Sequence, residues 1–142
     1  MQITTLGIDV AKNVFELHGV DARGHAVLSR RVKRQQVLDT VASLPPCVIG
    51  MEACGSAQHW GRAFEQLGHT VKLMHPKYVT PYVKTNKNDG RDAEAICEAV
   101  GRPTIMRFVS IKTVEQVDMQ ALHRTRSLFV KHRTAVINQI RG

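Results

Sequence analysis

The sequence predicts an α/β domain, a mixed β-sheet flanked by helices, that is followed by one long amphipathic helix. Short segments of alternating or continuous apolar residues fill the first third of the chain and indicate strands. Between about residues 37 and 100, helical and strand-like patterns alternate, which favours a sheet with helices on its faces. Neither Gly nor Pro interrupts residues 111–141, and this is typical of a single continuous helix.

Strands are expected first, before any helix. Residues 3–8 form a short apolar run that ends at Asp9. Residues 13–20 alternate between apolar and polar side chains, residues 21–24 have the composition of a tight turn, and residues 25–32 alternate again. This order predicts two or three strands, of which the later ones form a hairpin.

The first helix is expected between residues 37 and 44, where apolar side chains recur every three or four positions. Pro45 and Pro46 end it, because proline cannot donate the backbone hydrogen bond of a helix interior. Residues 47–51 are a continuous apolar run that ends at Glu52. Such a run fits a strand that is buried on both faces.

The same alternation continues to residue 100. Ser56 is the expected N-cap of a helix that Gly68 ends. Residues 70–74 are expected to form the next strand, and residues 75–90 a long loop. The predicted order is therefore three strands, helix, strand, helix, strand, loop and helix. The last of these helices has its apolar stripe at Ala93, Ile96, Cys97 and Val100.

The long helix has apolar residues at a spacing of seven, which is the pattern of a coiled coil. We therefore expect one folded domain over residues 1–110. Over residues 111–142 we expect the start of a long, coiled-coil-like helix that leads to a C-terminal domain absent from this chain. The two series of apolar positions are Leu122, Phe129 and Val136, and Ala121, Leu128 and Ala135.

The composition is that of a globular protein with an unusual charge. Hydrophobic residues make up 43% of the 142 positions and charged residues 23%, but the net charge is +8, which favours a polyanionic partner such as nucleic acid. The three cysteines, Cys47, Cys54 and Cys97, form no C-x-x-C pair, and the N-terminus has neither a basic region nor a long apolar run. These features predict reduced thiols in a cytosolic protein, without a zinc site, a signal peptide or a membrane span.

Four acidic residues occupy positions at which active sites commonly form. Asp9 and Glu52 each follow a predicted strand, and sites often lie at the ends of neighbouring strands. Asp89 and Asp92 lie three residues apart at a predicted helix start, so they share a helix face. If that helix packs near the strand ends, four carboxylates converge, and a divalent cation relieves their repulsion. Oxygen ligands suit Mg²⁺ or Mn²⁺, and two such ions can activate a nucleophile in phosphodiester chemistry.

Structural roles stay open for the same acids. Asp89 and Asp92 also fit the pattern of a helix cap, and Asp9 could simply end a strand. Glu52 is harder to explain in this way, because it follows a buried strand and precedes small residues, where an unpaired charge is costly. Capping and metal binding do not exclude each other.

The remaining aromatic and imidazole side chains have plainer interpretations. His59, His69 and His75 lack metal-ligand spacing with one another, and we expect them at the surface or at sheet edges. Trp60 lies on the apolar stripe of its helix and is expected in the core.

Three segments of the chain resemble the motifs of one known family. They are GIDVAKNVFELH at residues 7–18, MEACGSAQHWGR at 51–62 and KNDGRDAEAICEA at 87–99. They are similar to segments of the DEDD transposase and site-specific invertase family of the Piv/MooV kind, the insertion-sequence-one-ten group, and they occur in the same order. The resemblance covers residues 3 to about 100. It implies a RuvC-like N-terminal domain with the RNase H fold, which agrees with the predicted strand order.

The resemblance also implies a function. By position, the catalytic, metal-binding tetrad of the family falls on Asp9, Glu52, Asp89 and Asp92, with Mg²⁺ or Mn²⁺ as cofactor. It implies a metal-dependent DNA transposase or recombinase of an insertion sequence, located in the bacterial cytoplasm and associated with the nucleoid when bound to DNA. In this family a nucleophilic serine lies in a C-terminal domain, and some members use a structured guide RNA. We expect little or no recombination from these 142 residues alone.

Basic residues next to the acids and on the long helix are candidates for nucleic-acid contact, since phosphate contact requires charge rather than a particular sequence. The long helix also makes a homo-oligomer a reasonable expectation. The candidates are Lys84, Lys87 and Arg91 near the acids, and Arg124, Arg126, Lys131 and Arg133 on the helix.

Two other functions fit parts of the sequence. The basic helix fits a non-catalytic module for nucleic-acid binding or oligomerisation. Residues 6–27 also resemble the first phosphate hairpin of the actin and sugar-kinase superfamily of ATP-binding proteins. Such a hairpin needs glycine or a small hydroxyl residue after the aspartate, whereas Ala11, Lys12 and Asn13 stand near that position here.

Overall fold

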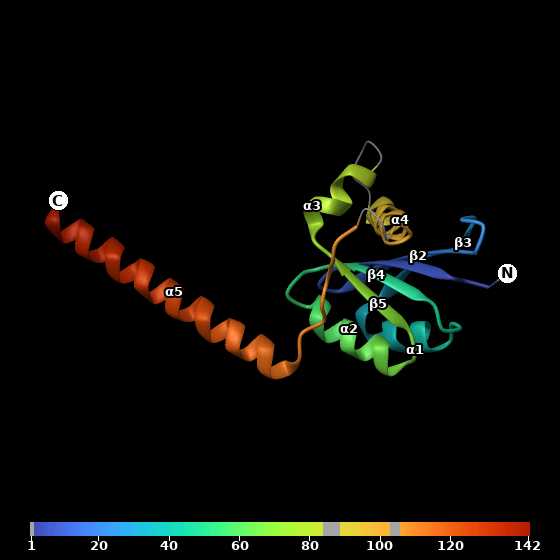
Figure 1. Cartoon of the computed structure of the whole chain (residues 1–142), viewed down its shortest axis with the longest axis horizontal. Coiled ribbons are helices and arrows are strands. Elements are labelled where there is room, and N and C mark those ends of the chain that lie inside the picture. The colour runs from blue at the N-terminus through green and yellow to red at the C-terminus, as the bar shows by residue number, and fades with distance from the viewer. Residues whose placement is uncertain (1, 84–88, 103–105) are drawn as a thin grey trace. The chain divides into compact units, whose positions relative to one another are not determined.

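The computed structural model describes residues 2–83, 89–102 and 106–142, and for residues 89 and 90 the backbone alone. The chain divides into two compact units, residues 1–111 and residues 112–142 (Figure 1). Among the described residues, no helix combines the length and the apolar character that crossing a bilayer requires. The first unit contains β1 (Thr5–Val10), β2 (Val14–Val20), β3 (Ala26–Lys33), η1 (Arg34–Gln36), α1 (Val37–Ala42), β4 (Val48–Glu52), α2 (Ala57–Gln66), β5 (Thr70–Met74), α3 (Pro76–Val79), η2 (Thr80–Tyr82), α4 (Asp89–Val100) and β6 (Phe108–Val109), and the second contains α5 (Val114–Arg141).

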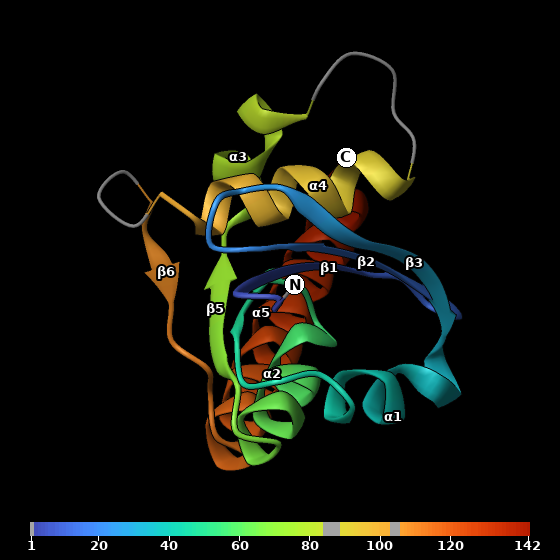
Figure 2. The same cartoon turned by 90° about the vertical axis from the view of Figure 1, so that its right-hand side faces the viewer.

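The strands form one mixed sheet in the order β3-β2-β1-β4-β5-β6. β4 pairs in parallel with both β1 and β5, and the other three pairings are antiparallel. Helices α1 and α2 cover one face of the sheet and α4 covers the other (Figures 1 and 2). The predicted α/β fold, a mixed sheet flanked by helices and followed by a long helix, is therefore confirmed.

Each face of the sheet has its own hydrophobic core. On the α1 and α2 side, Leu6, Ile8 and Ile49 of the sheet pack with Val41 and Phe64, and all five are fully buried. On the α4 side the core is smaller, because two of the strand positions beneath that helix are glycines. Its buried members are Met74, Val79, Ala95, Ile96, Ala99, Val100 and Met106.

The two glycines under α4 allow the helix to lie unusually close to the sheet. A Cβ atom added to Gly7 would come within 2.2 Å of the Ala93 carbonyl oxygen and 2.6 Å of the Cys97 nitrogen. A Cβ atom added to Gly50 would lie 2.9 Å from the Cβ atom of Val100. Both glycines therefore face α4, and the helix crosses β1 and β4 at these two points.

The predicted loop at residues 75–90 contains a helical turn that the sequence pattern did not indicate. The short helix α3 begins at Pro76, which needs no hydrogen-bond partner at the first helical position. The His75 ring caps it, since its Nδ1 atom accepts the Lys77 N–H at 3.2 Å. The two-residue strand β6 was also missed, because so short an edge strand depends on its pairing with β5 rather than on a sequence pattern.

Two expectations about individual side chains change. His69 is not at the surface: it is buried, because its ring joins β4 to the end of α1. Ser56 occupies the predicted N-cap position of α2, but its side chain makes no capping hydrogen bond. Its hydroxyl oxygen lies 3.5 Å from the sulfur atom of Cys54 instead.

The second unit is the helix α5. It begins at Val114, slightly later than expected, because Thr113 and Gln116 form a reciprocal capping box. None of its residues is buried within this unit of the chain.

Candidate functional site

Asp9 and Glu52 lie at the ends of two adjacent parallel strands, as predicted. The register of β1 and β4 pairs Gly7 with Gly50 and Ile8 with Met51, and the two acids are the next residues along. Side chains alternate along a strand, so an acid two residues beyond a glycine that faces α4 points to the same side. Both acids are partly buried. They therefore share one row and one face of the sheet.

The direction of α4 brings its first turn toward these acids. The Cys97 thiol donates to the Thr5 carbonyl at a distance of 3.8 Å, and Ala93 crosses β1 further along, at Gly7. The helix thus runs opposite to β1, and its N-terminal end lies toward the strand end that carries Asp9. Asp92 belongs to this first turn and is partly buried.

Asp92 also lies on the side of α4 that faces β4. It stands four residues before Ile96, whose Cγ2 atom would be 3.3 Å from a Cβ atom at Gly50. Residues four apart lie on one helix face. The Asp92 position therefore extends this face toward the end of β4, where Glu52 lies.

The fourth acid is only partly described. The helix α4 begins at Asp89, but the Asp89 side chain lies outside the described residues, as do Lys84 and Lys87. Among the side chains that the structure describes, no group of three or more His, Cys, Asp or Glu residues is placed to hold a metal ion. A metal site formed by the four acids therefore stays a prediction.

The donor set nevertheless has the right chemistry for a hard divalent cation. Every predicted ligand is a carboxylate, the group that Mg²⁺ and Mn²⁺ favour. A further acid, Glu16 of β2, pairs in register with Asp9 and so points to the same face. Glu16 forms an ion pair with Arg31 of β3, which compensates its charge. Sequence alternation placed Glu16 on a strand, but only the register sets it beside Asp9.

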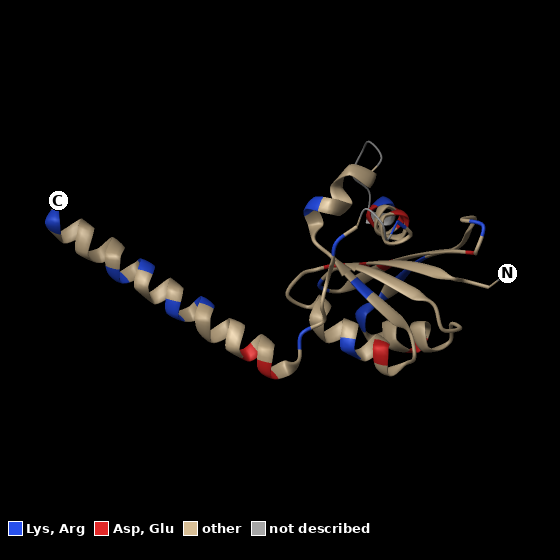
Figure 3. Cartoon of the chain, in the orientation of Figure 1, with Lys and Arg blue, Asp and Glu red and all other residues tan. Residues whose placement is uncertain are grey.

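The predicted basic contacts fall in both units (Figure 3). Arg91 is exposed in the first turn of α4, next to Asp92. The four basic residues on α5 are exposed as well, within the second unit, namely Arg124, Arg126, Lys131 and Arg133.

Two of the three thiols belong to the packing and not to the chemistry. Cys97 lies between α4 and β1, and Cys47 lies at the start of β4. Burial raises the pKa of each thiol to about 11, so both are protonated near neutral pH and unreactive. Cys54, just after Glu52, is exposed.

The fold is similar to that of RuvC. A structure of T. thermophilus RuvC in complex with a Holliday junction substrate matches 76% of this chain and all of that chain, with a TM-score of 0.58 and 13% sequence identity. A second RuvC structure from Thermus thermophilus matches 74% of this chain with a TM-score of 0.54 and 14% identity. At such low identity these matches establish the fold, and they confirm the predicted RuvC-like architecture.

The sequence then identifies the family. A profile of the DEDD transposases of the IS110 type, described as transposase, matches residues 6–142, and the chain belongs to this family. It is 52% identical over 142 residues to a probable family 20 transposase of Pseudomonas aeruginosa, covering all of this chain and 42% of that protein. It is 54% identical over 140 residues to the transposase of insertion sequence element IS1111A from Coxiella burnetii, covering 99% of this chain and 38% of that protein. The chain thus spans about two fifths of the length of these relatives.

Proposed function

We propose that this chain is the RuvC-like catalytic part of a DNA transposase of an insertion sequence. Residues 1–110 form the proposed catalytic domain, and residues 111–142 begin a long helix that leads to a C-terminal domain. The observation that carries the proposal is the shared row and face of Asp9 and Glu52, with the first turn of α4 directed to the same end of β1. Family membership supports DNA as the substrate.

In this proposal the four acids Asp9, Glu52, Asp89 and Asp92 bind Mg²⁺ or Mn²⁺. A bound divalent ion would activate the attacking oxygen and stabilise the leaving oxygen of a phosphodiester bond. Asp9 and Glu52 lie at the ends of two strands of the sheet, and Asp92 lies in the first turn of a helix packed on that sheet. Arg91, Lys84 and Lys87 would contact the phosphate backbone beside them.

We assign the joining of DNA strands to the C-terminal domain of the complete protein. There we place a nucleophilic serine, as the family resemblance implies. We also propose that a structured guide RNA takes part, with the basic residues of α5 among its contacts. Transposition therefore requires the complete protein, and residues 1–142 alone are expected to show little or none.

Self-association through α5 completes the proposal. The helix has apolar side chains at a spacing of seven that are exposed within its unit, including Leu122 (65% exposed), Phe129 (66%) and Val136 (59%). Apolar residues with this repeat are stabilised when a second helix covers them. A second copy of the same helix is the partner that we propose.

The proposed metal site can be tested by isothermal titration of Mn²⁺ into the chain in the presence of a short DNA duplex. We expect Mn²⁺ binding by the wild type and its loss in Asp9→Ala, because removal of one carboxylate breaks a shared site. Asp39→Ala is the matched control, since Asp39 is an exposed acid on α1, the helix on the opposite face of the sheet. Equal Mn²⁺ binding by Asp9→Ala and the wild type would refute the proposed metal site.

A non-catalytic nucleic-acid-binding or oligomerisation module is the competing function. It predicts that the complete transposase keeps its recombination activity when all four acids are replaced by alanine. Loss of recombination with unchanged DNA binding would exclude it.

A further inference from the structure

One end of β3 is strongly basic, and the proposed function leaves this segment unused. Four of the five residues at positions 30–34 are Arg or Lys, and all four are exposed, whereas residues 26–29 include no charged side chain. β3 is one of the two edge strands of the sheet that the structure describes. If these charges served only to protect the edge strand from aggregation, we would expect them along its whole exposed length. Here they gather at one end, which indicates a more specific role.

Register connects this basic end to the candidate site. Glu16 pairs with Asp9 on one side and with Arg31 on the other, so these three residues form one row on the α4 face. Lys33 pairs with Val14 and, two residues beyond Arg31, points to the same face. Arg31 and Lys33 therefore lie on the same side of the sheet as the acids, at the same end.

The turn between β1 and β2 adds Lys12 to this surface. Arg34 ties the turn to the end of β3, because its Nη1 donates to the Lys12 carbonyl at 3.4 Å and its backbone N–H donates to the Asn13 carbonyl at 2.9 Å. The Arg34 guanidinium is itself held over the Trp60 ring, 5.1 Å from the ring centroid. Lys12 thus stands on a turn that is fixed beside the basic end of β3.

These cations differ in how far their charge is already compensated. Arg31 is paired with Glu16. Within the part of the chain that the structure describes, neither Lys12 nor Lys33 takes part in an ion pair. Lys12 and Lys33 thus present two exposed ammonium groups close to the row formed by Asp9, Glu16 and Arg31. Lysine contacts the phosphates of a nucleic-acid backbone as a point charge, so these two groups suit such a partner.

We propose that Lys12 and Lys33, next to Arg31, bind the phosphate backbone of the DNA strand that enters the carboxylate site. This surface would position the strand on the β3 side of Asp9. The helix α4, which carries Asp92 and Arg91, packs over β1, β2 and β4 on the same face of the sheet. The inference rests on the proposed function for the identity of the DNA, but the contact itself requires no metal ion.

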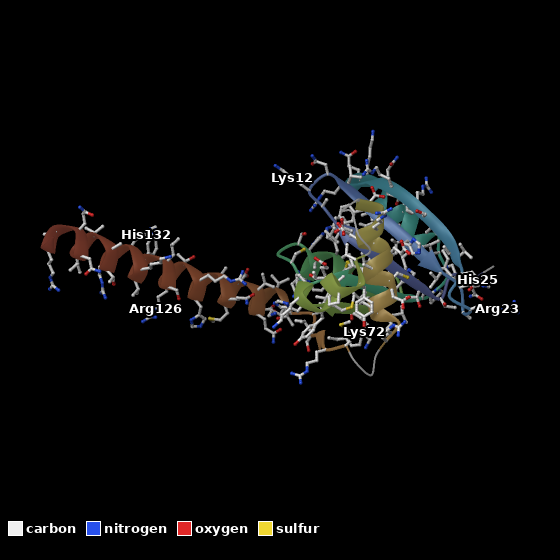
Figure 4. The ribbon with its side chains drawn as sticks, turned by 90° about the horizontal axis from the view of Figure 1, so that it is seen from above. Lys12, Arg23, His25, Lys72, Arg126 and His132 are labelled. Carbon is white, nitrogen blue, oxygen red and sulfur yellow. The ribbon has the colours of Figure 1, made fainter. Side chains whose placement is uncertain are left out.

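The test compares two double variants of the chain in binding to a short fluorescent DNA duplex, in EDTA and over a range of salt concentrations. Lys12→Gln/Lys33→Gln removes two charges from the proposed surface. Arg23→Gln/Arg30→Gln is the matched control: Arg30 alternates to the opposite face of β3, and Arg23 lies at the far end of the hairpin from Lys12 (Figure 4). Melting temperatures verify that both variants fold.

We expect Lys12→Gln/Lys33→Gln to bind DNA about tenfold more weakly near physiological salt and to reduce the salt slope by about two, because two phosphate contacts are lost. The control should retain the wild-type affinity. Equal losses in the two variants would overturn the proposal in favour of general charge attraction. A loss confined to an RNA duplex of the same length would overturn it in favour of an RNA surface.

A parallel Mn²⁺ titration separates this inference from the proposed function. The lysine variant should bind Mn²⁺ as the wild type does, because neither lysine is a metal ligand. If the wild type bound no Mn²⁺, the proposed catalytic site would fail, but the DNA affinities would still decide whether this surface exists.

Discussion

Gly7 lies in close contact with the backbone of α4. The atoms that a Cβ would meet are the Ala93 carbonyl oxygen and the Cys97 nitrogen, both in the helix backbone, so neither can rotate away. Any side chain at this position would push the helix outward. Since α4 carries two of the predicted acids, the glycine matters for the geometry of the proposed site as well as for packing.

Gly7→Ala is therefore expected to lower the free energy of unfolding by at least about 2 kcal/mol, because overpacking at a rigid contact forces the backbone to move. Denaturant titration measures the change. Gly55→Ala is the control, as a Cβ atom there would meet no atom within 4 Å, and its effect should stay within about 0.5 kcal/mol. Equal midpoints for the two variants would show that α4 can shift without cost.

The buried thiols lead to a prediction about reactivity and pH. Cys54 should react quickly with a thiol reagent at pH 8, whereas Cys47 and Cys97 should react only after unfolding, because burial raises their pKa to about 11. The pKa is raised only in the folded state. Unfolded thiols therefore lose their protons above their ordinary pKa of 9.0, whereas folded thiols keep theirs until the pH reaches about 11. Stability should therefore fall as the pH rises from about 9 to about 11.

Replacing both buried thiols tests this assignment. Denaturant midpoints at pH 8 and pH 10.5 should differ less in Cys47→Ala/Cys97→Ala than in the wild type, because the two ionising groups are gone. Cys54→Ser serves as the control and should leave the pH dependence unchanged. Fast modification of more than one thiol in the folded chain would contradict the prediction.

Between elements, the His69 ring makes a buried polar connection in the α1 and α2 layer. Its Nδ1 atom accepts the backbone N–H of Cys47 at 3.3 Å, and its Nε2 atom lies 3.3 Å from the Val41 carbonyl. The ring thereby joins the start of β4 to the last turn of α1. No periodicity indicates this role, because it depends on two segments that are distant in sequence.

His69→Ala should destabilise the fold by about 2 kcal/mol, since it leaves the buried backbone N–H of Cys47 without its acceptor. Thermal or chemical unfolding gives the value. His132→Ala, at an exposed position on α5, should have almost no effect. Similar unfolding curves for the two variants would mean that water replaces the ring.

At the scale of the whole molecule, the exposed apolar residues of α5 predict self-association. We expect the chain to sediment as a dimer or a larger species, and Phe129→Glu to shift it toward the monomer, because a buried, unpaired carboxylate is costly at a helix interface. Gln139→Glu introduces the same charge at another exposed α5 position and should change the equilibrium little. A monomeric wild type at high concentration would rule out α5 as a self-association helix.

The sequence alone determined most of the elements and the positions of the candidate acids. Alternation, apolar runs and helix-ending residues are local signals, and they placed Asp9 and Glu52 at strand ends and Asp92 near a helix start. The turn at α3 and the strand β6 could not be predicted, because they are too short to show a periodic pattern. The burial of His69 could not be predicted either, because it depends on contacts between distant segments.

Only the tertiary structure decided which of these residues share a face. Strand register places Asp9, Glu52, Glu16 and Arg31 in one row, and a shift by a single residue would turn a strand's side chains to the opposite side. The direction of α4, set by its close contact at Gly7, brings Asp92 toward the same end. Pairing and packing between distant segments are not encoded in local periodicity. This is why the places of Asp9 and Glu52 at strand ends could be predicted from the sequence, but their common face could not.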